Sequence, residues 1–214
     1  PHLASSAASD VYKRQGVGVI FYVLLALRRA LIDANFFTAQ NAPNLAVLLD
    51  LVALGTVADV VPLDHNNRIF VQQGLLRMRA GFACEGIKAI AKVAGRDLTQ
   101  LRAMDLGFMV GPRLNAAGRL DDMTRGIRCL LTDDANEAQA LAAELDALNR
   151  ERRAIETSMQ VDAASALEGL MQVDEPPAGI CLYQDDWHQG VIGILASRVK
   201  EKYHRPTIIF AEDS

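Results

Sequence analysis

The sequence contains only three cysteines, and none of them lies at the CxxC spacing of a metal or redox motif. Cys84, Cys129 and Cys181 each lie in an apolar run, so we expect buried free thiols in a reducing compartment. Long apolar runs are also missing, because Arg28 and Arg29 interrupt the best candidate for a membrane span. No secretory signal pattern opens the chain, so we expect a cytoplasmic protein that is not associated with a membrane.

An excess of basic residues is missing as well. The chain has 22 Lys and Arg against 26 Asp and Glu, which gives a net charge of −4 at pH 7. Any surface that binds nucleic acid must therefore be a local patch rather than the whole face of the molecule. With 50% hydrophobic and 22% charged residues, the composition is that of a globular chain. Its 214 residues suffice for one large domain or two small ones.

The beginning of the chain differs from the rest. Residues 5–15 have no apolar periodicity, and they resemble the in-frame translation of a common sequencing adapter. We therefore interpret residues 1–15 as a non-native stretch and expect the native sequence to begin near Gly16. The chain ends directly after a strand-like run, so we expect both ends to be cuts.

Apolar residues recur at helical spacing through the first half of the chain. The pattern predicts helices over 17–31, 43–58, about 67–80, a short segment between 81 and 95, and about 101–109. Gly111 and Pro112 should break the last of these helices, which would leave the following residues in a loop.

A long amphipathic helix is predicted over residues 133–172, because its apolar positions follow a 3.6-residue period. We interpret its opposite, mixed-charge side as a solvated face, with nucleic-acid binding as the alternative. Residues 173–177 are typical of a linker. A strand over 179–183, a helix over 191–203 and a strand over 207–210 then predict a β-α-β unit.

Three segments combine glycine, small residues and charge. In the first, residues 50–63, Asp59 is flanked by apolar residues, where burial penalises a charge that is not paired or bound to a cation. Carboxylate oxygens suit Mg²⁺ or Mn²⁺. The residues alone leave two interpretations equally open, a metal ligand or a helix-end aspartate that caps the next turn.

The second segment, residues 111–120, holds Arg113, Asn115 and Arg119 among glycine, proline and alanine. Small residues allow a ligand to approach the backbone, and guanidinium groups match phosphate oxygens. The alternative is that the two arginines pair with Asp121 and Asp122.

The third segment, residues 187–198, joins the first strand of the β-α-β unit to its helix. Amides at the helix start can hold an anion, and His188 and Arg198 could contribute to such a site. A structural role for the single histidine is the alternative.

The three segments DLVALGTVADVVPL, GPRLNAAGRLDDM and WHQGVIGILASRVKEKYHRP together resemble the motifs of RecJ-type nucleases, in the DHH phosphoesterase superfamily. They occur in the same order as in that family, and the similarity extends from Gly16 to about Ala211. The resemblance implies an α/β architecture. Residues 16–132 would be the helix-rich C-terminal part of the DHH catalytic domain with the start of the interdomain region, 133–172 the connecting helix, and 173–214 a partial α/β DHH-associated domain.

The resemblance also implies the chemistry, namely 5′→3′ exonuclease hydrolysis of single-stranded DNA in recombination and repair. Two Mn²⁺ or Mg²⁺ ions would activate water and stabilise charge on the scissile phosphate. The family places an aspartate ligand four residues after a glycine, which is Asp59 after Gly55 here, with Asp50 as the alternative. Single-stranded DNA is the implied partner, with a single-strand-binding protein and a helicase as protein partners of a monomer.

The resemblance further implies that Arg113, Asn115 and Arg119 line the DNA path, and that His188 and Gly190 shape its other wall. The DxD and DHH motifs of the family lie upstream of Gly16 and do not occur here. A single carboxylate cannot organise a two-metal site, so we expect this polypeptide alone to be inactive.

Two alternatives remain open from the sequence. The first is a phosphodiesterase of the same superfamily that acts on short oligonucleotides or cyclic dinucleotides. The second is a non-catalytic module that binds single strands.

Overall fold

The computed structural model describes residues 15–168 and 177–212. The expected non-native stretch lies outside these residues except for Gln15, and so does most of the expected linker. The helices of the described part are, in chain order, α2 (Gly16–Asp33), η1 (Leu45–Leu48), α3 (Leu49–Ala58), α4 (His65–Arg79), α5 (Glu85–Val93), η2 (Leu98–Gln100), α6 (Ala103–Asp105), η3 (Leu106–Val110), α7 (Gly111–Leu120), α8 (Thr124–Leu131), α9 (Ala135–Glu168) and α10 (Ile192–Tyr203). The strands are β1 (Ile180–Tyr183) and β2 (Thr207–Phe210).

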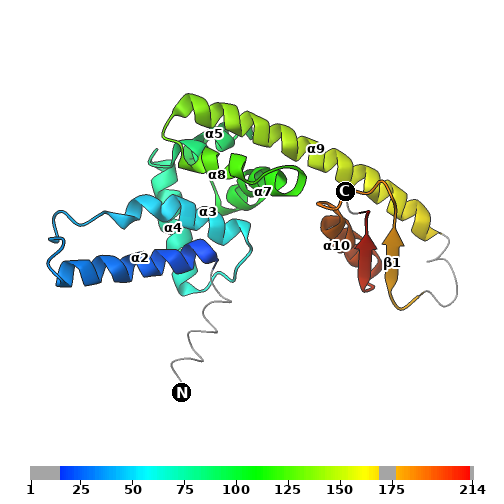
Figure 1. Cartoon of the computed structure of the whole chain (residues 1–214), viewed down its shortest axis with the longest axis horizontal. Helices are drawn as coiled ribbons and strands as arrows, with labels where there is room; N and C mark the ends of the chain where they lie inside the picture. Colours follow the sequence, from blue (N-terminus) through cyan, green and yellow to red (C-terminus); the bar gives the residue numbers. More distant parts are fainter. Residues whose placement is uncertain (1–14, 169–176, 213–214) are drawn as a thin grey trace, which may run out of the picture.

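Most of the helices form one lobe around a shared core (Figure 1). Ile87 and Ile90 of α5, Leu106 before α7 and Leu145 of α9 are all fully buried in it. The helices pack closely where small residues meet. A Cβ added to Gly86 of α5 would lie 2.0 Å from the backbone oxygen of Cys129 in α8. The two backbones are therefore in direct contact, which only glycine permits at this position.

The 34-residue helix α9 belongs to two cores. Leu141 and Leu145 in its N-terminal half pack into the helical lobe. Met159 and Leu167 in its C-terminal half pack into a second core with β1, β2 and α10. Figure 1 shows α9 passing from the lobe to this C-terminal unit. The expected connecting helix is confirmed over 135–168, and the remainder of its expected range lies outside the described residues.

The C-terminal unit is the predicted β-α-β unit. Its strands are parallel, with Ile180 opposite Thr207 and Tyr183 opposite Phe210, and α10 forms the crossover between them. Alternate residues of β1 are buried, as a strand with one covered face requires. Cys181 is at an uncovered position and is exposed, so our expectation of a buried thiol was wrong for this residue. Cys129 is buried and Cys84 partly so, and all three are free thiols.

The segment 111–120 is a helix and not the loop that we predicted. A π turn, η3, runs directly into α7, and Gly111 keeps helical torsion angles of −54° and −46°. Pro112 lies in the first turn of α7, directly after the π turn, and the helix continues through it. Arg113, Asn115 and Arg119 are therefore fixed on one rigid element.

Other boundaries also differ from the prediction. The segment 43–58 is a short 3-10 helix followed by α3 rather than one helix. The helix α4 begins at His65 rather than near residue 67; Asp64 caps it, and its carboxylate accepts from the amide of Asn67 at 2.8 Å. The helix α8 was not predicted. Within the described ranges, no helix combines the length and the apolar character needed to cross a membrane.

Candidate nucleic-acid interface

A groove with four arginines lies where α7, α9 and α10 meet. Its volume is about 440 Å³. We call it the arginine groove, and the polar and charged side chains that line it are Asn115, Arg119, Arg152, Arg153, Glu156 and Arg198. With four guanidinium groups against one carboxylate, the groove carries a formal charge of +3 in a chain whose net charge is −4. It is thus the local basic patch that an acidic chain needs to bind a polyanion.

The arginines of the groove are close enough to repel one another. Burial lowers the pKa of Arg152 below its ordinary value, and the positive charges of Arg153, Arg119 and Arg198 lower it further. The carboxylate of Glu156 acts in the opposite direction. A polyanion in the groove would relieve this repulsion, because guanidinium groups bind phosphate oxygens by charge-assisted hydrogen bonds.

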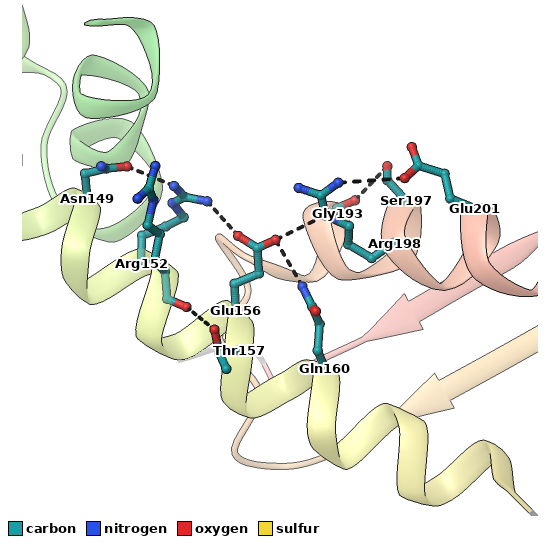
Figure 2. A network of polar contacts seen from close by, with 10 residues as sticks. Asn149, Arg152, Glu156, Thr157, Gln160, Gly193, Ser197, Arg198 and Glu201 are labelled. Atoms are coloured by element: carbon teal, nitrogen blue, oxygen red, sulfur yellow. Dashed lines mark hydrogen bonds and ion pairs between the residues drawn. The ribbon is translucent and has the colours of Figure 1, made fainter. Parts of the chain in front are cut away.

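Glu156 connects the two helices that form the groove wall. Its carboxylate contacts Nη1 of Arg152 at 2.7 Å and Nε of Arg198 at 3.3 Å. Gln160 donates to the same carboxylate at 3.1 Å, and Asn149 accepts from Nη2 of Arg152 at 2.8 Å. Figure 2 shows Glu156 pointing from α9 toward α10, between the two arginines.

A second joint between lobe and C-terminal unit lies at Gly190. Nη1 of Arg119 donates to the backbone oxygen of Gly190 at 3.1 Å. A Cβ at Gly190 would lie 2.0 Å from the backbone oxygen of Arg119, so the two segments touch. The amide of Gly190 donates to Nδ1 of His188 at 3.0 Å. The structure thus brings Arg119 and Gly190 together, whereas half-buried His188 closes the turn and does not line the groove.

Asp59 lies in a neighbouring hollow of about 380 Å³. It follows the last residue of α3 and is exposed, because the chain turns away at Val60, which has a φ of 54°. Our expectation that apolar neighbours would bury this carboxylate was therefore wrong. Asn115 lines both the hollow and the arginine groove, so the two lie on adjoining sides of α7.

Asp50, the alternative ligand, is engaged in the packing of the lobe. It is 2% exposed, and its two oxygens accept from the amides of Leu51 and Cys84 at 2.8 Å and 2.7 Å. It fixes the start of α5, since Cys84 is the N-cap of that helix. Across the described ranges, no group of three or more His, Cys, Asp or Glu side chains is arranged to hold a metal ion. Of the two aspartates, only Asp59 is an exposed carboxylate that could contribute a ligand to a metal.

Arg113 is turned away from the groove. Its Nε and Nη2 contact one oxygen of Asp146 in α9 at 2.9 Å and 2.8 Å, and its Nη1 donates to the backbone of Met109 at 2.6 Å. The alternative that we weighed for the two arginines, pairing with Asp121 and Asp122, does not hold either. Asp121 instead pairs with Arg125 at 2.9 Å.

The arginines of α9 are functional candidates that the sequence did not single out. We interpreted the side of the long helix that carries Arg152, Arg153 and Glu156 as a solvated face, with nucleic-acid binding as the alternative. The one available signal was the charge density of the run from Arg150 to Arg153 on a helix already predicted. Arg198 was considered as an anion ligand, and it lies in the groove opposite α9.

No family model matches the chain. It is 59% identical over 199 residues to the single-stranded-DNA-specific exonuclease RecJ of Escherichia coli, an alignment that covers 92% of this chain and 34% of that protein. It therefore spans about a third of the length of the curated relatives that it matches.

Two solved structures are similar over most of the chain. A structure of exonuclease RecJ bound to manganese matches with a TM-score of 0.76 at 37% identity, and covers 94% of this chain and 47% of that one. RecJ from Thermus thermophilus in complex with Mg²⁺ matches with a TM-score of 0.67 at 38% identity, and covers 80% of this chain and 26% of that one.

Proposed function

Because this chain belongs to the RecJ family, we propose that it forms the phosphate-binding groove of a metal-dependent exonuclease that degrades single-stranded DNA from the 5′ end. The arginine groove carries this proposal. Four guanidinium groups from three helices converge in one hollow, and guanidinium groups are the side chains best suited to phosphate oxygens. The related proteins are named as exonucleases specific for single-stranded DNA, which agrees with such a groove. We further propose that the role implied by the family resemblance, in recombination and repair, applies to the protein that contains this groove.

Two of the proposed DNA contacts, Asn115 and Arg119, lie in the groove itself. Arg152, Arg153 and Arg198 join them as phosphate ligands of the proposed interface. Arg113 and Gly190 hold α7 against α9 and against the C-terminal unit, and His188 closes the turn at Gly190, so all three act indirectly. Contacts to phosphate carry no base information, so the groove binds strands of any sequence.

Asp59 is the proposed metal ligand of this chain. It is an exposed carboxylate beside Asn115, and carboxylate oxygens suit the Mg²⁺ and Mn²⁺ named with the related structures. Bound there, the metal would activate water and stabilise negative charge at the phosphate. The residues of this chain hold and orient the strand. Since Asp59 is one ligand and not a full set, we propose that this polypeptide alone binds single strands without cleaving them.

The test is an equilibrium titration of the 214-residue chain with a fluorescent oligothymidylate, in the absence of metal. We expect binding whose affinity falls with salt, and a slope that flattens by about 0.7 for each arginine removed. Arg119→Gln should weaken binding by about tenfold, the value of one charge-assisted hydrogen bond. Arg150→Gln removes an exposed arginine that does not line the groove and should leave the slope unchanged. A wild-type chain that binds no oligothymidylate would contradict the proposal.

Metal dependence needs the longer protein that contains this chain. There, Asp59→Asn should abolish the Mn²⁺-dependent release of nucleotides from a 5′-labelled strand and leave binding without metal unchanged. Asp50→Asn should instead lower the stability of the fold, because the Asp50 carboxylate accepts from the amide of Cys84, the N-cap residue of α5. Nucleotide release by the 214-residue chain alone would show that Asp59 is not one ligand of a larger set.

A further inference from the structure

Glu156 is an acidic residue in a groove whose proposed ligand is an anion. Its side chain is 10% exposed, and it is the only carboxylate among the described residues that line the groove. Considered as a charge alone, it lowers the positive potential and should weaken the binding of phosphate. A buried carboxylate is stable only when cations or hydrogen-bond donors compensate it, and Glu156 has three such partners.

The contacts of Glu156 have the opposite effect to its charge. Arg152 belongs to α9 and Arg198 to α10, and Glu156 binds both through its two oxygens. Arg198 has one further acidic neighbour, Glu201, at 3.7 Å, and both side chains of this pair are exposed. Without Glu156, the repulsion between Arg152 and Arg198 would be uncompensated, and both long side chains would gain rotational freedom. Ordering them again on binding phosphate would cost affinity.

We propose that Glu156 is a positioning residue, whose carboxylate holds Arg152 and Arg198 side by side on the groove wall so that both engage the phosphates of one strand. The inference rests on the proposed function of the groove and deepens it. It assigns binding to a preformed constellation that spans two helices rather than to four independent cations. The network in Figure 2 is that constellation, with Asn149 and Gln160 supporting it from α9.

The direction of the change in affinity separates positioning from charge. We expect Glu156→Gln in the 214-residue chain to weaken oligothymidylate binding by about tenfold and to flatten the salt slope by about 0.7 to 1.4, which corresponds to one or two lost phosphate contacts. The matched control is Glu201→Gln, which also removes a negative charge beside Arg198 and should leave the slope unchanged. Stronger binding or unchanged binding by Glu156→Gln would overturn the proposal.

A second measurement needs no DNA, so the failure of this inference can be told apart from the failure of the proposed function. The order parameters of the arginine Nε–H groups, measured by NMR relaxation, report how firmly each side chain is held. They should fall for Arg152 and Arg198 in Glu156→Gln and stay unchanged in Glu201→Gln. If they do not fall, Glu156 does not position the arginines. If they fall but the wild-type chain binds no oligothymidylate, only the proposed function is wrong.

Circular dichroism and the emission of buried Trp187 show whether each variant keeps the wild-type fold. If Glu156→Gln does not fold, Glu156→Asp replaces it. The shorter side chain keeps the charge but cannot reach both helices, so the same loss of affinity and slope is expected. Wild-type binding by Glu156→Asp would overturn the proposal, because charge would then suffice.

Discussion

Arg113 and Asp146 form an ion pair where α7 packs against α9. Their side chains are 10% and 18% exposed, and the guanidinium group also donates to the backbone of Met109. A charged pair that is mostly withdrawn from water contributes to stability through its hydrogen bonds, and the loss of Arg113 would leave Asp146 with only the exposed Arg150 at 3.6 Å. Arg113 therefore acts on the fold rather than directly on a ligand.

We expect Arg113→Ala to lower the free energy of unfolding by about 3 kcal/mol, because Asp146 would keep its charge at a mostly buried position. Urea unfolding followed by circular dichroism measures this. The matched control is Arg150→Ala, which removes an exposed partner of the same carboxylate and should cost less than about 0.5 kcal/mol. Equal effects of the two substitutions would contradict the assignment.

Because of the thiols of Cys84 and Cys129, the stability of the fold should depend on pH in the alkaline range. Burial raises the pKa of each to about 11, from an ordinary value of 9.0. The folded state thus keeps its thiol protons at a pH where the unfolded chain has lost them. Stability should fall as the pH rises from about 9 to about 11. In the double variant Cys84→Ala/Cys129→Ala, the urea concentration at the midpoint of unfolding should fall less steeply over this range than in the wild type. In the control Cys181→Ala, it should fall as steeply as in the wild type.

The two aspartates of the first motif show how far the sequence could predict individual residues. Asp50 and Asp59 both lie in apolar surroundings in the sequence, and a ligand and a structural cap have the same local pattern. The distinction depends on contacts 34 residues away, since Asp50 binds the amide of Cys84. The motif located the region, and only the fold distinguishes the engaged carboxylate from the exposed one.

The helix α7 is the element on which prediction and structure differ most. Glycine and proline together indicate a break, yet the chain continues from the π turn η3 into α7 with helical torsion angles. A π turn inside a helix is a local rearrangement with no distinct residue pattern, so periodicity could not predict it. The consequence is functional, because a helix holds Asn115 and Arg119 at a fixed spacing beside the groove.

The contact between α7 and the loop before α10 can be tested at Gly190. A Cβ there would lie 2.0 Å from the backbone oxygen of Arg119, and neither backbone can yield without separating the two segments. We expect Gly190→Ala to expose Trp187 to quenching by acrylamide and to weaken oligothymidylate binding. The matched control is Gly193→Ala in α10, where nothing lies within 4 Å. It should leave binding unchanged and stabilise the chain by about 0.5 kcal/mol. If acrylamide quenches Trp187 no more strongly in Gly190→Ala than in the wild type, the contact is refuted.

The molecule as a whole consists of two hydrophobic cores that share the single helix α9. Its length and its β-α-β partner were predictable, because helical and strand periods are local properties of the sequence. The convergence of Arg119, Arg152 and Arg198 was not, because it depends on how three helices from distant parts of the chain cross. Apolar periodicity identifies the buried side of each helix but not its neighbour.

Two cores on one helix should unfold separately. Trp187, the only tryptophan, reports the C-terminal core, whereas far-ultraviolet circular dichroism reports mainly the helical lobe. We expect the fluorescence transition in urea to occur at a lower concentration than the dichroism transition, because the C-terminal core is the smaller. Coincident transitions would show instead that α9 couples the two cores into one cooperative unit.

The position of the groove along α9 has a mechanical consequence. A helix of 34 residues is about 51 Å long. Arg152, Arg153 and Glu156 lie near its midpoint, between the part that packs into the helical lobe and the part that packs into the C-terminal core. If the helix bends there, the lobe and the C-terminal unit rotate relative to one another, and the width of the groove changes with the angle between them. A DNA strand bound at this point would contact both the lobe and the C-terminal unit. Its phosphate backbone would therefore fix the angle between them.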